Sequence, residues 1–181
     1  MIFTALPLTG AYCINLDRRA DERGFFARVF CSREFQENGL APNFVQVNTS
    51  FSRRAGTLRG LHFQRAPMAE AKLVRCLKGR IFDVIVDLRA DSETFGHSTT
   101  VELDAETRQM IYVPQGFAHG FQTLEPDTEL LYFHSQFYSP EHEGGLAHND
   151  PHLSIRWPLA VSELSARDAA FPALDALDPI V

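Results

Sequence analysis

The sequence has few cysteines and no long hydrophobic run, and each shortage excludes a class of protein. Its three cysteines, Cys13, Cys31 and Cys76, form no CxxC pair. An odd, scattered set is typical of reduced thiols, so we expect a protein of a reducing, cytoplasmic compartment. No apolar segment approaches the roughly 20 residues that span a bilayer. Residues 1–12 lack the basic and apolar segments of a signal peptide. We therefore expect neither a membrane span nor a secretory signal.

Positive charge is scarce as well. With 17 Lys and Arg against 23 Asp and Glu, the formal net charge is −6. This balance argues against general binding to nucleic acid or to an acidic membrane, so any anion site must be built locally. The chain contains no internal repeat, low-complexity segment or linker, and its 181 residues suit a single domain spanning 1–181 with a sizeable core.

Short apolar segments separated by turn residues predict an all-β sandwich or barrel. Apolar and polar residues alternate cleanly over residues 44–50, which places Gln46 and Asn48 on one face of a strand. Two hairpins are predicted, one from residues 72–76 and 80–88 and the other from residues 99–103 and 109–113.

The remaining segments are expected at the periphery. Residues 32–40 start with a candidate Ser cap and end near a glycine, which predicts a helix of about two turns. On the strand over residues 80–88, the apolar face of Phe82, Val84 and Val86 is expected to face the core. The C-terminal tail, about residues 160–181, has mixed polarity, and we expect a short helix or loop packing over the barrel.

The stretch from Gly56 to Gln64 contains the first candidate site. It places Arg59 and His62 three residues apart on a short strand, with Gly60 between them, where a bulge or a close backbone approach is common. One interpretation is a His base with an Arg nearby for an anion or a developing negative charge. The other is a half-buried His beside a surface Arg. These nine residues alone leave both interpretations open.

The stretch from Pro114 to Phe121 is the second informative segment, because its PxGxxH spacing, ending at His119, resembles the second cupin motif. In metal-binding cupins the first motif supplies a His-x-His pair and a Glu. Here the corresponding place has His62 followed two residues later by Gln64, and glutamine is a poor ligand for a transition metal. One histidine from each motif does not make a persuasive site, so we expect no metal and no other cofactor.

Three further side chains are informative only as part of a set. Tyr132 and Tyr138 lie six residues apart on a strand predicted over residues 129–138, and they face the same side if that strand is regular. Considered alone, the two tyrosines would be interpreted as packed aromatic side chains with hydroxyl groups at the surface. Asp168 would likewise be an ordinary solvated acid.

Together these segments resemble the dTDP-4-dehydrorhamnose 3,5-epimerase family over nearly the whole chain. The combination of the LRGLH segment with the later AHGF segment is highly specific. The matching segments are Arg23-Gly24-Phe25-Phe26, Gln46-Val47-Asn48, residues 56–64, Lys72, residues 82–87, residues 112–121 and Asn149-Asp150-Pro151.

The resemblance implies an all-β, cupin-type jelly-roll barrel with short peripheral helices that works without metal. It also implies a homodimer in which the N-terminal strands help to build the partner's nucleotide site. The implied substrate is a nucleotide-linked 4-keto-6-deoxy sugar. Its C4 ketone acidifies the hydrogens at C3 and C5, so a base can remove one, an enolate forms, and an acid returns a proton to the opposite face. The expected reaction inverts C3 and C5 of dTDP-4-keto-6-deoxyglucose.

The resemblance also implies a role for each matching polar residue. His62 would be the general base and Tyr132 the general acid. Asp168 would fix the tautomer of His62 and support its charged form, and Lys72 would stabilise the enolate oxygen. The implied substrate-binding residues are Arg23, Phe26, Gln46, Asn48, Arg59, His119, Tyr138, Glu143 and Arg167. Among these, Tyr138 would stack on the thymine ring.

One position departs from the family pattern. The family usually has Glu in the segment Arg-Gly-x-Phe-x-Glu, and this chain has Arg28. A binding carboxylate is thereby replaced by a cation, which concerns nucleotide recognition rather than proton transfer. The alternatives are an epimerase that inverts only C3, a metal-dependent cupin oxygenase or isomerase, and a non-catalytic sugar-nucleotide binder. The last would not require the proton-transfer set.

Overall fold

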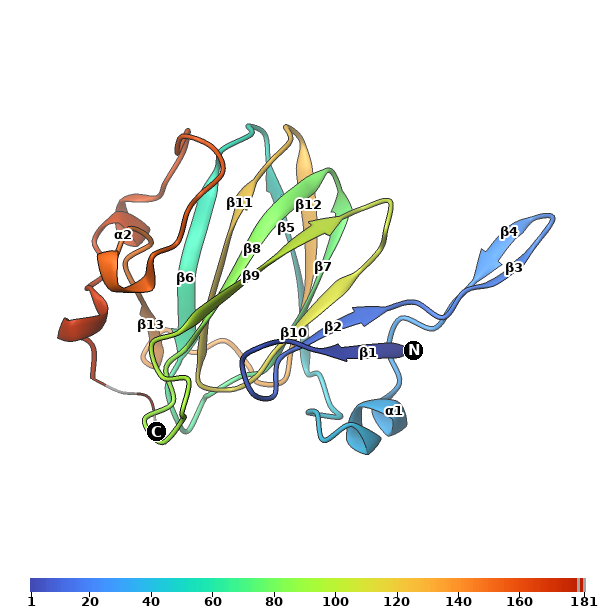
Figure 1. Ribbon diagram of the computed structural model, residues 1–181, viewed down its shortest axis with the longest axis horizontal. Helices are drawn as coiled ribbons and strands as arrows, with labels where there is room; N and C mark the ends of the chain where they lie inside the picture. Colours follow the sequence, from blue (N-terminus) through green and yellow to red (C-terminus); the bar gives the residue numbers. More distant parts are fainter. Residues whose placement is uncertain (179, 181) are drawn as a thin grey trace.

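Two antiparallel sheets face each other in the computed structural model, which describes residues 1–178 and 180 (Figure 1). The six-stranded sheet has the order β1 (Ile2–Ala5), β2 (Tyr12–Asn15), β10 (Met110–Val113), β7 (Lys72–Lys78), β12 (Thr128–His134) and β5 (Gln46–Ser52). The five-stranded sheet has the order β13 (Glu143–Gly145), β6 (Leu58–Gln64), β11 (Phe117–Thr123), β8 (Arg80–Asp87) and β9 (Ser98–Asp104). The expected all-β architecture is confirmed.

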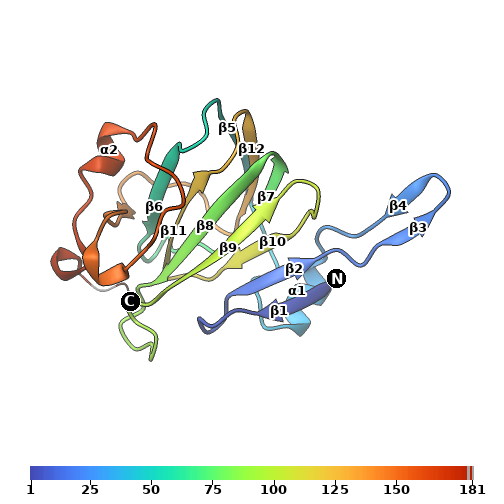
Figure 2. The same cartoon turned by 45° about the horizontal axis from the view of Figure 1, so that its top comes forward.

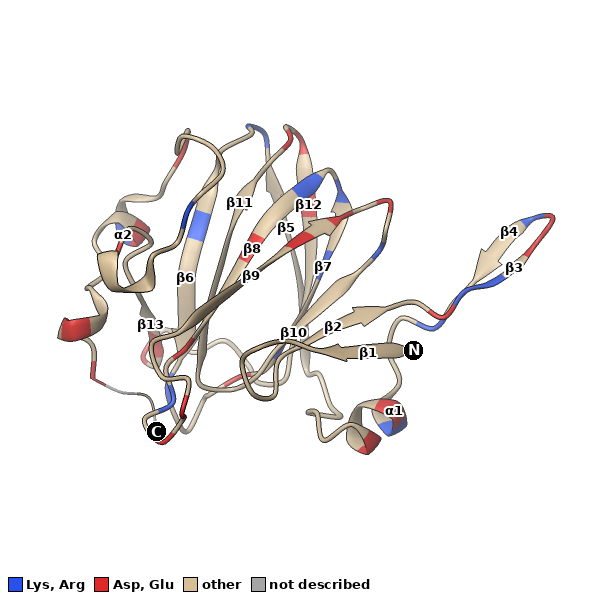
Figure 3. Ribbon diagram, viewed as in Figure 1, with Lys and Arg blue, Asp and Glu red and all other residues tan. Residues whose placement is uncertain are grey.

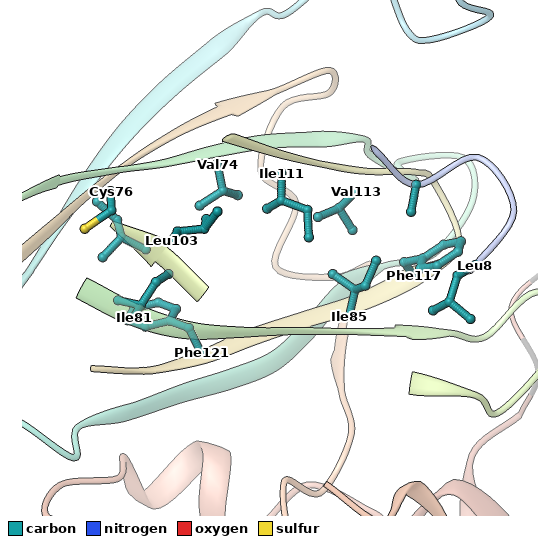
Figure 4. Packing of buried hydrophobic residues seen from close by; sticks show 12 residues of the cluster. Leu8, Val74, Cys76, Ile81, Ile85, Leu103, Ile111, Val113, Phe117 and Phe121 are labelled. Atoms are coloured by element: carbon teal, nitrogen blue, oxygen red, sulfur yellow. The ribbon is translucent and has the colours of Figure 1, made fainter. Parts of the chain in front are cut away.

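The main core lies between the two sheets. Apolar side chains of β7 and β10 meet those of β8 and β11 there, and Figure 4 shows them interlocking in one layer. Each strand contributes alternate residues to this layer, because successive side chains on a strand point to opposite faces. This core fixes the separation of the sheets, and the polar side chains at one end of it are therefore held by rigid strands.

A second apolar layer covers the outer face of the five-stranded sheet. Leu61 of β6 and Val84 of β8 pack there against the chain that follows β13, including Leu153 and Ile180. This part of the chain contains the 3₁₀ turns η1 (Pro151–Leu153) and η2 (Leu174–Ala176) and the short helix α2 (Ala166–Ala169). The C-terminal tail thus packs over the barrel, as Figure 1 shows.

The helix expected over residues 32–40 is α1 (Ser32–Glu37). Its N-cap is Cys31 rather than Ser32, and no side chain caps it. Phe35 is fully buried and packs edge-to-face against Phe3 and Tyr112, which anchors α1 on the outer face of the six-stranded sheet. Among the described residues, no helix is long and apolar enough to cross a membrane.

A two-stranded arm projects from the barrel. It consists of β3 (Arg19–Asp21) and β4 (Gly24–Phe26), which pair antiparallel. Figures 1 and 2 show it extending away from both sheets, and Figure 3 shows residues of both charges along it. The guanidinium carbons of Arg18, which precedes β3, and of Arg108, in the β9–β10 loop, lie 4.8 and 4.9 Å from the centroid of the Phe25 ring, so cation–π contacts hold the arm against that loop.

Both predicted hairpins are wrong, although all four strands are present. β7 pairs with β10 and β12 in the six-stranded sheet, whereas β8 pairs with β11 and β9 in the other. In the same way β9 and β10 belong to different sheets. A short connection suits a hairpin, but it equally suits a corner where the chain crosses between sheets, and local sequence does not distinguish the two.

The orientation predicted for β8 is also corrected. The face that contains Ile81, Asp83 and Ile85 points into the barrel, and all three residues are fully buried. The face that contains Val84 and Val86 is buried too, beneath the C-terminal layer. The prediction failed because Asp83 and Asp87 made the inward face look like the solvent face, although β8 is covered on both sides and both carboxylates are buried. As a consequence, Asp83 is directed into the barrel interior.

β6 and β11 approach unusually closely at Gly60, as the strand glycine predicted. The register of the two strands shifts there, between His119 and Phe121 of β11. Gly60 has φ +120°, and a Cβ atom at this position would lie 2.6 Å from the Gly120 Cα atom. The shift explains why Arg59 and His62, three residues apart, both line the same cavity.

We expect Gly60→Ala to destabilise the protein by about 3 kcal/mol or more, because backbone strain and overpacking add at this site. Gly24→Ala is the matched control, since Gly24 has φ +128° but nothing lies within 4 Å of the place that its added methyl group would occupy. That control should cost only about 1 kcal/mol. Chemical unfolding of both variants measures the difference, and equal losses would show that the contact with Gly120 is unimportant.

Candidate active site

A cavity of about 770 Å³ lies between the sheets, at the end of the barrel not filled by the apolar core. Strands β5, β7 and β12 line it from one sheet, β6 and β11 from the other, and residues 163–168 of the C-terminal layer complete it. The predicted site residues that line it are Asn48, Arg59, His62, Lys72, His119, Tyr132, Tyr138, Glu143, Arg167 and Asp168.

His62 and Asp168 form a pair, although 106 positions separate them in the chain. The Nε2 atom of His62 lies 2.9 Å from Asp168 Oδ1, and the backbone N–H of Gly60 donates to Asp168 Oδ2 at 3.0 Å. Helix α2 presents Asp168, whose side chain is 7% exposed, while that of His62 is 31% exposed to the cavity. The histidine can therefore meet a ligand while the carboxylate holds its ring in place.

Asp168 is held in its charged form. Burial acts to raise the pKa of this carboxyl, but the hydrogen bonds from His62 and Gly60 outweigh burial and lower the pKa to about 2. In the unfolded chain an aspartate titrates near pH 4. The charged form therefore stabilises the fold fully above about pH 4, and this stabilisation is lost as the pH falls towards 2.

An acid-titration experiment checks this assignment. Asp168→Asn cannot lose a proton, so the difference in unfolding free energy between wild type and this variant should shrink by about 1 kcal/mol between pH 5 and pH 3. Urea unfolding at the two pH values measures it. A difference independent of pH would mean that the pKa of Asp168 is not depressed.

Tyr132 faces the cavity from the opposite sheet. Its hydroxyl lies 2.8 Å from Ser50 Oγ, and burial raises its pKa. The Tyr132 ring meets that of His119 edge-to-face, with centroids 6.5 Å apart. Because His62 lies on β6 and Tyr132 on β12, a ligand between the two sheets would have a basic group on one side and a protonated hydroxyl on the other.

Lys72 supplies a cation beside this pair. Its side chain is only 8% exposed, and Nζ donates to the carbonyl oxygen of His62 at 3.2 Å. Nζ also lies 3.3 Å from Glu70 Oε1. A buried ammonium ion with a free side towards a cavity is well suited to a developing oxyanion.

A second His–Asp pair lies deeper in the barrel. His119 Nε2 is 2.8 Å from Asp83 Oδ2, and both side chains are almost completely buried. Burial raises the pKa of Asp83, and the attraction of His119 acts against that rise. The other carboxylate oxygen, Asp83 Oδ1, has no hydrogen-bond partner among the described residues.

Arg59 contributes a second cation to the cavity. Its Nε atom donates to Ser52 Oγ at 3.2 Å and one terminal nitrogen donates to the Phe51 carbonyl at 3.1 Å. These are neutral partners from β5, so the guanidinium charge is not cancelled by a carboxylate in these contacts. A planar group of this kind suits a phosphate.

The mouth of the cavity is formed by a polar cluster. Tyr138 donates its hydroxyl proton to Glu143 at 2.7 Å, and Glu143 forms an ion pair with Arg167. β12 ends at His134, so Tyr138 lies beyond the strand on which it was predicted. Gln46 and Asn48 are hydrogen-bonded to each other at 3.3 Å, and Asn48 lines the cavity while Gln46 lies next to it.

Two predicted site residues are not brought to this cavity. Arg23 and Phe26 lie on the projecting arm, with the Arg23 side chain 89% and Phe26 76% exposed. Arg23 pairs there with Asp21. Arg28, which departs from the family pattern, is also remote from the cavity and lies 2.5 Å from Glu34.

Sequence reasoning missed three residues that build the site, namely Glu70, His134 and Asp83. Glu70 precedes Lys72 by two positions and His134 follows Tyr132 by two, and such spacing places the side chains on one face of an extended segment. The two-residue spacing could therefore have identified both Glu70 and His134. Asp83 lies in the matching segment 82–87, but no role was predicted for it, because its orientation depended on which face of β8 looks inward.

Chemically, the cavity combines a histidine held by a carboxylate, a tyrosine hydroxyl on the facing sheet and two cations. Among residues 1–178 and 180, no group of three or more His, Cys, Asp or Glu side chains is arranged to hold a metal ion. A base and an acid on opposite sides of a bound carbon can move protons between its two faces. The fold and the site together are typical of an acid–base isomerase.

Comparison with known proteins identifies the family. A model of the dTDP-4-dehydrorhamnose 3,5-epimerase family matches residues 5–176. The Salmonella typhimurium protein of that name is 48% identical over 157 residues, which cover 86% of this chain and 85% of the relative. The structure of the Elizabethkingia anophelis protein of that name has a TM-score of 0.94 at 44% identity, covering 97% of each chain. The chain therefore belongs to the dTDP-4-dehydrorhamnose 3,5-epimerase family of isomerases, and the expected cupin-type jelly roll is confirmed.

A structure with a different activity is similar as well. A 3′-monoepimerase from Streptomyces bikiniensis, solved in complex with dTDP-quinovose, has a TM-score of 0.86 at 34% identity. The similarity covers 94% of this chain and 86% of that chain. The same fold thus occurs in a protein described as acting at one carbon.

Proposed function

We propose that this chain inverts C3 and C5 of dTDP-4-keto-6-deoxyglucose and yields dTDP-4-keto-rhamnose. The observation that carries the proposal is the placement of His62 and Tyr132 on facing sheets of one cavity, with Lys72 beside them. Family membership supplies the class of substrate. It also favours an epimerase over a metal-dependent cupin or a non-catalytic binder.

In this mechanism one residue acts as the base and another, on the facing sheet, acts as the acid. His62 removes the proton next to the C4 ketone, and Asp168 supports the imidazolium that forms. The electron pair of the broken C–H bond moves to the ketone oxygen, and the Lys72 ammonium stabilises the resulting enolate. Tyr132 then donates its hydroxyl proton to the opposite face of the same carbon, and solvent restores both groups. Repetition at the second carbon completes the reaction.

The remaining cavity residues fit recognition of the nucleotide diphosphate. Arg59 and His119 would contact the sugar-diphosphate region. Tyr138 at the mouth would stack on the base, with Glu143 and Arg167 around it. Gln46 and Asn48 supply amide donors and acceptors beside the same region. The whole chain is thereby proposed as one catalytic domain.

The arm fits a shared site in a homodimer. Arg23 lies in its turn and Phe26 on β4, both are exposed, and neither lines its own cavity, so we propose that they complete the nucleotide site of a second copy. Light scattering should then give a mass of twice the chain's 20.4 kDa. A monomer at micromolar concentration would contradict this part of the proposal.

The cysteine chemistry is consistent with a cytoplasmic enzyme. Burial raises the pKa of both Cys13 and Cys76 to about 11, so these two side chains remain unreactive thiols at neutral pH. Free thiols of this kind are typical of a reducing compartment.

Proton NMR in D₂O tests the reaction. With purified protein and dTDP-4-keto-6-deoxyglucose, we expect deuterium to enter at both C3 and C5, and the inverted product can be trapped with a 4-ketoreductase. Absence of exchange at both carbons would overturn the proposal and would direct attention to Arg28 and to other nucleotide sugars.

Inversion at C3 alone is the second candidate. The similarity to a 3′-monoepimerase favours it, because one acid–base pair serves either outcome. The same spectra decide the question, since deuterium confined to C3 would support the single-centre reaction.

A further inference from the structure

A buried carboxylate, Glu70, links two groups in the cavity wall. Its Oε1 atom lies 3.3 Å from Lys72 Nζ and its Oε2 atom lies 2.7 Å from His134 Nδ1. All three side chains are largely buried, with exposed fractions of 8% for Glu70, 8% for Lys72 and 14% for His134. Burial acts to raise the pKa of Glu70, but Lys72 and His134 outweigh it and lower the pKa, so the carboxylate is charged.

The contacts of His134 determine which of its nitrogens carries a proton. A charged carboxylate only accepts hydrogen bonds, so Nδ1 of His134 must donate to Glu70. In the neutral ring Nε2 is then an acceptor, which matches the Asn48 Nδ2 donor 3.4 Å away. Asn48 Oδ1 accepts from Gln46 Nε2 at 3.3 Å, and Gln46 Oε1 accepts from the Tyr138 backbone N–H at 3.2 Å. A continuous polar chain thus runs from the cavity mouth to Lys72.

His134 also touches the other half of the site. Its ring stacks on that of Tyr132, with centroids 6.1 Å apart and an interplanar angle of 27°. The two residues are two positions apart on β12 and point to the same face. His134 therefore contacts both the proposed acid, Tyr132, and the carboxylate that pairs with Lys72, without itself belonging to the His62–Asp168 pair.

We propose that Glu70 and His134 are positioning residues that hold the Lys72 ammonium towards the reacting sugar; this inference rests on the proposed function. A lysine is a point charge on a flexible stem, and burial without a counterion would favour its neutral form. Around Lys72, β6 offers the carbonyl of His62 and β12 offers His134 and Tyr132, while Asp83 from β8 is paired with His119. In the described structure, Glu70 is the carboxylate in direct contact with Nζ.

The first test removes the charge of Glu70 and keeps its shape. Glu70→Gln should lower kcat for epimerisation by about 10- to 100-fold, the range expected for losing a hydrogen bond to a charged group. The dissociation constant for dTDP, measured by calorimetry, should change less than about twofold, since Glu70 acts on the sugar end. Glu102→Gln, on the exposed face of β9 and paired with Arg80, is the control and should leave both quantities unchanged.

Glu70→Asp separates charge from packing. It restores the carboxylate on a shorter stem, so we expect it to recover part of the kcat that Glu70→Gln loses. Equal losses in both variants, or kcat within about twofold of wild type in Glu70→Gln, would overturn the proposal.

A double-mutant cycle tests whether the two residues act together. His134→Phe keeps a ring against Tyr132 but gives Glu70 no donor. Because both residues act on Lys72 through one carboxylate, kcat of Glu70→Gln combined with His134→Phe should be close to that of Glu70→Gln alone. Losses that simply multiply would show independent roles.

The tautomer of His134 can be measured without turnover, which distinguishes this inference from the reaction itself. Long-range ¹H–¹⁵N spectra of the purified protein, recorded where the His134 ring is neutral, should place the proton on Nδ1. A proton on Nε2 would overturn the inference whatever the activity. A wild-type protein with the Nδ1 tautomer and no exchange at C3 or C5 would instead reject the proposed function and leave Glu70 and His134 as an assembled polar network.

Discussion

His62→Ala should lower the epimerisation rate by about 10²- to 10⁴-fold, the range that a positioned general base contributes. The imidazole is the group that Asp168 orients at 2.9 Å and that the cavity exposes. Removing it leaves Lys72 and Tyr132 in place, so the variant should still bind dTDP. The variant should, however, no longer remove the proton from the carbon next to the ketone.

The measurement is deuterium wash-in at C3 and C5, because exchange reports deprotonation before any inversion. In His62→Ala both positions should exchange with the same large loss. His97→Ala is the matched control, since His97 is exposed in the β8–β9 loop and lies outside the cavity lining. Exchange at a near wild-type rate in His62→Ala would remove the base assignment.

The sequence was a good guide to the class of fold and a poor one to how strands associate. The sequence predicted strands β5 to β10 and β12, because alternation and short apolar segments follow from the local geometry of a strand, but it did not predict β3 or β13. It placed β7 and β8 in one hairpin, however, and the structure separates them into two sheets. Pairing is decided by contacts with β10, β11 and β12, which are distant in the chain.

In the site, too, residue types could be recognised locally, whereas their positions depend on segments that are distant in the chain. His62 and Arg59 were conspicuous as residue types, but the register shift at Gly60 that brings both into one cavity requires β11. Asp168 meets His62 across 106 positions, so its role followed from a family resemblance and could not follow from spacing. Glu70 and His134 matched no motif, although their two-residue spacing from Lys72 and Tyr132 was visible.

Arg23 and Phe26 illustrate a third limit. Their exposure on the arm means that one chain does not contain every group expected to contact the nucleotide. Side chains proposed to serve a second copy would leave no trace in the contacts of a single copy. The physical reason for proposing a site for them is therefore the arm itself, a hairpin that Arg18 and Arg108 contact at Phe25 and that carries Arg23 and Phe26 exposed.

Tyr132→Phe should separate exchange from inversion. His62 remains able to remove the proton and to return a deuteron to the face from which it came. The opposite face, by contrast, has lost the hydroxyl that Ser50 holds at 2.8 Å. We expect deuterium to enter at C3 at a rate within about tenfold of wild type while the inverted product forms about 10²- to 10⁴-fold more slowly.

The two rates must be measured on the same sample. NMR follows deuterium content, and trapping with a 4-ketoreductase follows inversion. Tyr12→Phe, which removes a hydroxyl from the outer face of the six-stranded sheet, is the control for loss of a tyrosine oxygen and should leave both rates unchanged. Full inversion at the wild-type rate in Tyr132→Phe would show that another group delivers the proton. Equal, large losses of exchange and inversion would instead mean that Tyr132 acts before the enolate forms, as a donor to the ketone oxygen.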